Sequence, residues 1–144
     1  MRAPGRFDAF RLARERGSLA GSVDATTLPR LADRVIGAQA PVDWRIDGTV
    51  DAMGRPALTV QLEGSVTLEC QRCLEALEWA ISQRTLLLLA HDEAETARLD
   101  AESEAEVLLA ATALDPETLV EDELVLALPY VARHPDGCCK PPAA

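Results

Sequence analysis

The sequence predicts an α+β fold, with a mainly antiparallel β-sheet over about residues 42–90, helices before it and one acidic helix after it, at about residues 116–128. Two observations predict this fold class. From Val42 onward apolar and polar residues alternate, which is typical of strands with one buried face. On either side of that region apolar residues recur at helical spacing. A chain of 144 residues suits one domain with one core.

The first 40 residues are expected to be helical. A short helix is predicted from Phe7 to Arg16, with Gly17 ending it. A second helix is predicted from Thr27 to Ile36, because threonine can cap a helix N-terminus and Pro29 fits the first turn.

The alternating region is expected to begin with an antiparallel hairpin. Two alternating runs are separated by Met53–Pro56, which indicates a turn. Gly64-Ser65 then indicates a turn or a bulge, and a further strand is predicted over residues 77–89. The positions that share the predicted buried face are Trp44, Ile46, Gly48, Val50, Leu58, Val60, Leu62, Val66, Leu68 and Cys70.

The region after the sheet is expected to hold a polar loop, a short strand and a helix. Residues 91–104 are predicted to be the loop, and residues 106–110 the strand. Asp115 and Pro116 predict the start of the helix, as cap and first helical residue. Its acidic residues are expected on the exposed face, and Pro129 ends it.

The charge of the chain is negative and unevenly distributed. The net charge is −10, which argues against a nucleic-acid binder that works through a broad basic face. Residues 91–123 hold twelve acids and one arginine. Such a run is either a solvated surface or a docking face for a basic protein partner. Basic residues concentrate instead near the N-terminus, where Arg11 and Arg14 are candidates for phosphate contacts.

The four cysteines raise the question of a metal site. Cys70 and Cys73 form a C-x2-C pair at the end of a predicted strand, and His134 precedes Cys138 and Cys139 far downstream. Three sulfurs and one imidazole suit the tetrahedral preference of zinc. Such a structural zinc ion would tie the irregular tail to the hairpin, with either Cys138 or Cys139 as the last ligand.

Other roles for these cysteines remain open. A thioredoxin-like redox motif would precede a helix, whereas the residues after Cys73 predict a strand. A disulfide is disfavoured in a reducing compartment. Cys70 could also be a small buried apolar residue with no ligand.

No other group of residues predicts chemistry. The sequence lacks a Gly-rich phosphate loop, and no nucleophile has a base beside it, so we do not expect an enzyme or a small-molecule substrate. No apolar run is long enough for a transmembrane helix, and the N-terminus lacks the apolar centre of a secretory signal. We therefore expect a cytoplasmic protein without a membrane partner.

The segment VTLECQRCLEAL, residues 66–77, followed by LVEDELVLALPYVARH and then cysteine, resembles the YceD family of large ribosomal RNA subunit accumulation proteins. The resemblance implies a single YceD-like domain over residues 1–144, comprising a helical part at 1–40, a sheet with the C-x2-C pair at 42–90, and a helix with a Cys/His tail at 115–139. The matching positions are Cys70, Arg72, Cys73, Glu121, Asp122, Glu123, Leu128, Pro129, His134 and Cys139. Cys138 is an extra residue in this register, so Cys139 is the preferred ligand.

The resemblance implies a non-catalytic accessory factor in the synthesis, processing or stability of 23S ribosomal RNA. We expect a ribosomal protein or a large-subunit assembly factor as the partner, with indirect or weak contact to the RNA itself. Two alternatives are a zinc-stabilised protein-interaction module with an indirect ribosomal effect, and a thiol redox protein.

Overall fold

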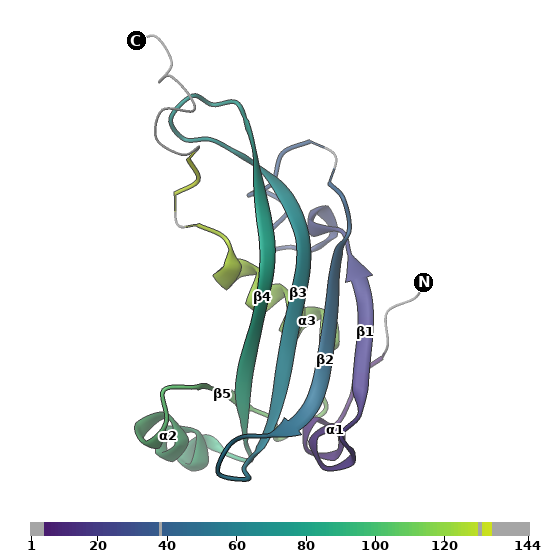
Figure 1. Ribbon diagram of the computed structural model, residues 1–144, viewed down its shortest axis with the longest axis vertical. Coiled ribbons are helices and arrows are strands. Elements are labelled where there is room, and N and C mark those ends of the chain that lie inside the picture. The colour runs from purple at the N-terminus through teal and green to yellow at the C-terminus, as the bar shows by residue number, and fades with distance from the viewer. Residues whose placement is uncertain (1–4, 38, 130, 134–144) are drawn as a thin grey trace.

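The computed structural model describes residues 5–37, 39–129 and 131–133. One five-stranded sheet, in the order β1-β2-β3-β4-β5, dominates it (Figure 1). Neighbours from β1 to β4 are antiparallel, and β5 pairs with β4 in parallel. The predicted α+β class is therefore confirmed. The elements are α1 Ala9–Glu15, β1 Ser18–Val23, β2 Val42–Val50, β3 Pro56–Glu69, β4 Ala76–Ala90, α2 Glu93–Glu102, β5 Glu106–Leu109 and α3 Pro116–Ala127.

The two faces of the sheet differ because side chains alternate along each strand. One face is apolar and packs against α3, which lies behind the strands in Figure 1. On the opposite face, polar side chains such as Arg45, Gln61 and Glu63 are exposed. Near the end of β4, α2 covers part of this second face, where Leu99 packs in a small cluster with Leu88. The alternation that predicted the strands therefore reflects one buried and one mostly wet face.

The N-terminal region is only partly helical. The first predicted helix is confirmed as α1, which Asp8 caps by accepting a hydrogen bond from the backbone N–H of Arg11. The second predicted helix is wrong, because residues 25–27 form a 3₁₀ turn and turns continue through residue 34. Leu28 is extended, with φ −95° and ψ 119°. The residue before a proline avoids helical geometry, so Pro29 prevents a helix from passing through this point.

Two predictions about loops are also wrong. Residues 93–102 form α2 rather than a loop, and Asp92 caps it by accepting from the backbone N–H of Glu95. Gly64-Ser65 is neither a turn nor a bulge, since β3 keeps one register with β4 through it. Gly64 has φ 154°, and a β-carbon there would lie 3.2 Å from the Cα of Val42. Glycine is required here because two strands approach closely.

Strand β1, which forms one edge of the sheet, is not predicted from the sequence. Gly21 on this strand lies against Trp44 of β2, since a β-carbon there would be 2.8 Å from the indole ring. In the described part of the chain, no helix is long and apolar enough to cross a bilayer.

Candidate functional site

The C-x2-C pair forms the tight turn that joins β3 to β4. The backbone N–H of Cys70 donates to the carbonyl of Glu75 at 2.9 Å, and the N–H of Leu74 donates to the carbonyl of Cys70 at 2.8 Å. Leu74 has φ 64°, in the left-handed region. Cys70 is fully buried and Cys73 half-buried. The turn therefore places both cysteines at one end of the sheet, as the sequence predicted.

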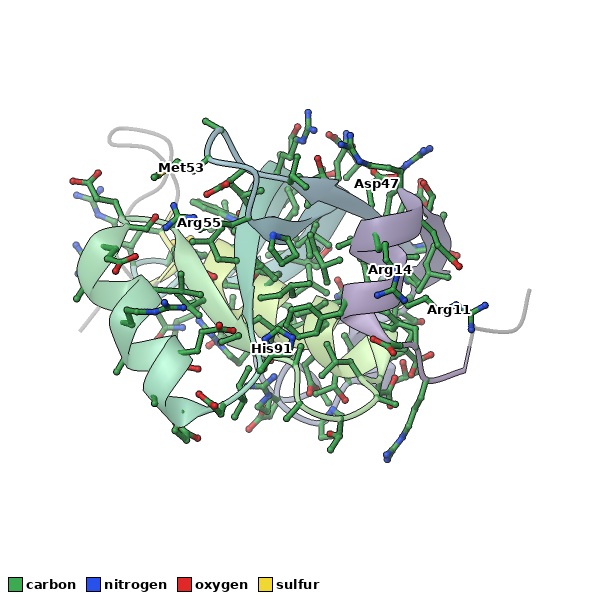
Figure 2. The ribbon with its side chains drawn as sticks, turned by 90° about the horizontal axis from the view of Figure 1, so that it is seen from below. Arg11, Arg14, Asp47, Met53, Arg55 and His91 are labelled. Carbon is green, nitrogen blue, oxygen red and sulfur yellow. The ribbon has the colours of Figure 1, made fainter. Side chains whose placement is uncertain are left out.

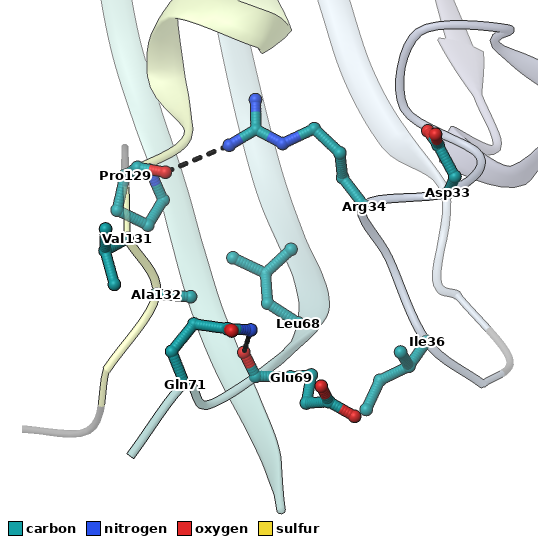
Figure 3. A pocket seen from close by; sticks show the side chains of 9 residues that line it. All are labelled: Asp33, Arg34, Ile36, Leu68, Glu69, Gln71, Pro129, Val131 and Ala132. Carbon is teal, nitrogen blue, oxygen red and sulfur yellow. Dashed lines mark hydrogen bonds between the residues drawn. The ribbon is translucent and has the colours of Figure 1, made fainter. Parts of the chain in front are cut away.

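The segment that follows α3 reaches this turn. The backbone N–H of Gln71 donates to the carbonyl of Ala132 at 2.8 Å, across 61 residues of sequence. Above it, the guanidinium of Arg34 donates to the carbonyl of Pro129 at 3.0 Å (Figure 3). Between these two contacts lies a cavity of about 450 Å³, with Leu68 at its centre. The segment after α3 therefore runs back to the C-x2-C turn and contacts it at Ala132.

The complete predicted metal site cannot be traced through the described residues. Cys70 and Cys73 are present in the turn, whereas His134, Cys138 and Cys139 lie outside the described part of the chain. Among the residues that are described, no three His, Cys, Asp or Glu side chains gather as metal ligands. The buried sulfur of Cys70 and the return of the tail suit a structural zinc ion. Zinc binding itself stays a prediction.

The surroundings of the cysteines differ from those of a thioredoxin-like motif. That motif precedes a helix in a βαβ unit, where the helix N-terminus lowers the thiol pKa. Here Cys70 and Cys73 join two antiparallel strands, and Cys70 is fully buried. Arg72 lies between them and is half-buried. This geometry favours a structural role over a redox role.

The predicted exposure of the acids on α3 is wrong for two of the three. Glu121 is 8% exposed, and its carboxylate accepts from the side chain of Arg30 at 3.2 Å and from its backbone N–H at 3.1 Å. Asp122 accepts from the same guanidinium. These contacts fasten α3 to the segment after β1. Because both carboxylates already hold an arginine of the same chain, they are poor docking groups for a basic partner.

Glu123 faces the other side of α3, toward β4 and β5, and is 3% exposed. Burial, and after it the negative charge of Glu106 on β5, raise its pKa to about 7. A hydrogen bond with the side chain of Thr85 on β4 opposes this increase in pKa. The sequence does not predict this carboxyl pair. Glu106 lies close to Glu123 because β5 pairs with β4 in parallel, and that pairing leaves no local pattern in the sequence.

The predicted phosphate contacts lie at the opposite end of the molecule from the C-x2-C turn. Arg11 and Arg14 project from α1, at the end that also holds His91 (Figures 1 and 2). Arg11 forms an exposed ion pair with Glu15 at 3.2 Å. Arg14 lines a cavity of about 270 Å³ together with His91. Arg72 is far from this group, so the structure does not bring the predicted binding residues into one site.

Sequence reasoning also missed an aromatic pair at this end. The ring of Phe10 on α1 stacks on His91, with 3.8 Å between centroids. The backbone N–H of His91 donates to the carboxylate of Glu95 at 2.8 Å, which is the main reason that the pKa of Glu95 is lowered. The imidazole Nδ1 of His91 lies 3.0 Å from the same oxygen and lowers this pKa further. The stack joins α1 to the start of α2. No signal in the sequence pairs two residues so far apart.

A comparison with known families identifies the chain. Residues 58–144 match the family model described as "Large ribosomal RNA subunit accumulation protein YceD". The chain belongs to the YceD family. No solved structure matches it. The family match begins within β3 and includes the C-x2-C turn, β4, α3 and the tail.

Some of the residues described above lie inside the region that matches the YceD family, and others lie outside it. Cys70, Arg72 and Cys73 lie inside it, as do the acids of α3. Arg30, which holds Glu121 and Asp122, lies outside it, as does Phe10. The family description concerns large-subunit ribosomal RNA, and the part of the chain that matches it includes most of β3, all of β4 and β5, and α3.

Proposed function

We propose that this YceD protein is a non-catalytic, cytoplasmic accessory factor in the synthesis, processing or stability of 23S ribosomal RNA. The family match over residues 58–144 is the observation that carries the proposal. The net charge of −10 supports action through a basic protein partner, such as a ribosomal protein or an assembly factor, rather than through a broad RNA contact.

The proposal predicts an effect on RNA levels in cells. Deletion of the gene is expected to lower the amount of 23S RNA relative to 16S RNA, because large-subunit RNA would be made, processed or protected less well. Quantifying both RNAs by electrophoresis checks this result, with a strain that carries the gene on a plasmid as the control. An unchanged ratio in the deletion strain would refute the proposal.

The zinc hypothesis makes a separate prediction. Purified protein is expected to carry zinc bound by Cys70, Cys73, His134 and Cys139, with Cys138 as the alternative last ligand, and the Cys73→Ser variant is expected to lose it. Elemental analysis measures the metal, and circular dichroism checks that the variant is folded. Ser82→Ala, which changes an exposed side chain away from the turn, is the control. Folded wild-type protein free of zinc, prepared without chelators, would contradict the prediction.

A further inference from the structure

The middle of the outer edge of β4, at residues 78–84, presents backbone groups to which no described residue bonds. Strands in antiparallel pairs alternate between residues that bond to the neighbour and residues whose N–H and C=O point away. The bond from Cys70 N–H to Glu75 C=O fixes this alternation, so odd-numbered residues of β4 bond to β3. The bond from Ala110 N–H to the carbonyl of Ala90 confirms that even-numbered residues point to the other side.

The strand on that other side, β5, is short. It pairs only with residues 87–90 of β4, at one end of a 15-residue strand. Along residues 78–84, which span about 20 Å of extended chain, no described backbone group bonds to the outward-pointing residues. A long free edge of this kind is a template for another strand. The outward-pointing residues are Glu78, Ala80, Ser82 and Arg84.

Helix α3 lies alongside the free edge on the buried face of the sheet. The indole N–H of Trp79 donates to the carbonyl of Ala127 at 3.0 Å, and Glu123 lies by Thr85. Leu126 is three residues after Glu123 and therefore shares its side of the helix. It is 64% exposed, although leucine is among the residue types most often fully buried. An added strand would cover it.

The same side of α3 also concentrates negative charge. Glu123 is buried beside Glu106, the first residue of β5, and Asp122 adds to the negative potential there. Arg30 pairs with Glu121 on the opposite side of the helix and with Asp122. Two carboxyl groups at the end of an open edge are complementary to a lysine or arginine on an added strand.

We propose that an extended segment of a basic protein partner adds a strand to β4 along residues Glu78–Arg84. Backbone hydrogen bonds to the even-numbered residues would hold it. One of its aliphatic side chains would cover Leu126, and a lysine or arginine would face Glu106 and Glu123. The identity of the partner as a large-subunit protein depends on the proposed function, whereas the added strand depends only on the edge.

Proline substitutions test the edge directly. Ala80→Pro removes one outward N–H without removing a bond to β3. Ala20→Pro is the matched control, because Ala20 is an exposed alanine on β1, the opposite edge of the sheet. The bond from Gly48 N–H to the carbonyl of Gly17 shows that the N–H of Ala20 also points away from the sheet. Circular dichroism and thermal melting confirm that both variants fold.

The probe is a synthetic ten-residue peptide of alternating lysine and valine. It is expected to slow amide hydrogen exchange at Ala80, Ser82 and Arg84, and Ala80→Pro is expected to weaken its binding about tenfold. Ala20→Pro is expected to leave binding unchanged. Leu126→Lys gives a second variant that does not alter the backbone. It is expected to weaken binding, whereas Met53→Lys at the exposed tip of the β2–β3 hairpin is expected not to.

Several results would overturn the proposal. Equal effects of Ala80→Pro and Ala20→Pro, or protection of β1 in place of β4, would exclude the edge. Equal binding of a glutamate–valine peptide would exclude charge complementarity. The β4 edge could also be protected from exchange without peptide, in a protein that sediments as a larger species. If Ala80→Pro loses both the protection and the larger species, the occupant of the edge is a second copy of this chain. Protection by a single-stranded oligouridylate and not by the peptide would identify RNA instead.

A cell experiment separates this proposal from the proposed function. Cells that express Ala80→Pro are expected to show the low 23S-to-16S ratio of the deletion strain, and cells that express Ala20→Pro a normal ratio. If deletion lowers the ratio and Ala80→Pro does not, the edge proposal fails and the function stands. If deletion has no effect, the function fails, and the peptide experiments alone decide whether the edge binds.

Discussion

We expect the Glu123→Gln variant to be more stable than the wild type at pH 8, by about 1–3 kcal/mol. Burial, together with the nearby charge of Glu106, raises the pKa of Glu123 from 4.5 to about 7. Between these values the folded protein binds a proton that the unfolded chain has lost. The contribution of Glu123 to stability therefore falls as the pH rises from about 4.5 to about 7, and stays low above it. Glutamine removes this loss because it cannot ionise.

Urea unfolding at pH 4 and pH 8 measures the effect. At pH 4 the carboxyl is protonated in both folded and unfolded chains, so the variant and the wild type should differ little. Glu104→Gln is the matched control, because the side chain of Glu104 is exposed and its replacement should leave the stability close to that of the wild type at both pH values. A difference between Glu123→Gln and the wild type that is the same at both pH values would show that the pKa of Glu123 is the same in the folded and unfolded chains, which would contradict the prediction.

The strands from residue 42 to residue 90 could be predicted because one face of the sheet is buried and the other is wet. Because of this difference, apolar residues recur at every second position of each strand. Helix α2 left a weaker signal, since Leu99 is its only buried residue among those described, and the other positions are polar. Its start was nevertheless marked by Asp92 and Glu95, three residues apart, which is typical of a helix N-terminus.

The acids of α3 show what the sequence pattern could not reveal. Their spacing is compatible with an exposed face, and burial of Glu121 depends on Arg30, 91 residues away. Burial of Glu123 depends on where β5 pairs with β4. Neither contact leaves a local pattern. Composition located the negative charge in the correct region, but only the fold separates buried carboxylates from exposed ones.

The candidate binding edge depends on the structure even more strongly. The sequence predicted a strand over residues 77–89 and a shorter one over residues 106–110, and both exist. Their parallel pairing at one end of β4 is what leaves the edge open, and pairing cannot be deduced from periodicity. The C-x2-C turn was easier to place, because a short motif between two alternating runs is a local feature.

Replacing Gly48 by alanine is expected to destabilise the protein by at least about 2–3 kcal/mol. Gly48 lies in β2 where α1 packs on the sheet, and a β-carbon there would be 2.0 Å from the carbonyl oxygen of Leu12 and 2.7 Å from the Cα of Ala13. Backbone atoms cannot rotate away as a side chain does. The helix would have to move as a unit, which would expose Ala9 and Ala13 and disturb the stack of Phe10 on His91.

Urea unfolding followed by tryptophan fluorescence measures this loss. Gly5→Ala is the control, because a β-carbon at Gly5 meets nothing within 4 Å. Gly21→Ala should fall between the two, since its nearest neighbour is the indole of Trp44, a side chain that can shift where backbone cannot. Equal stability of Gly48→Ala and Gly5→Ala would mean that α1 does not rest on β2. In that case Phe10 would not be held against His91, because α1 is the element that positions Phe10.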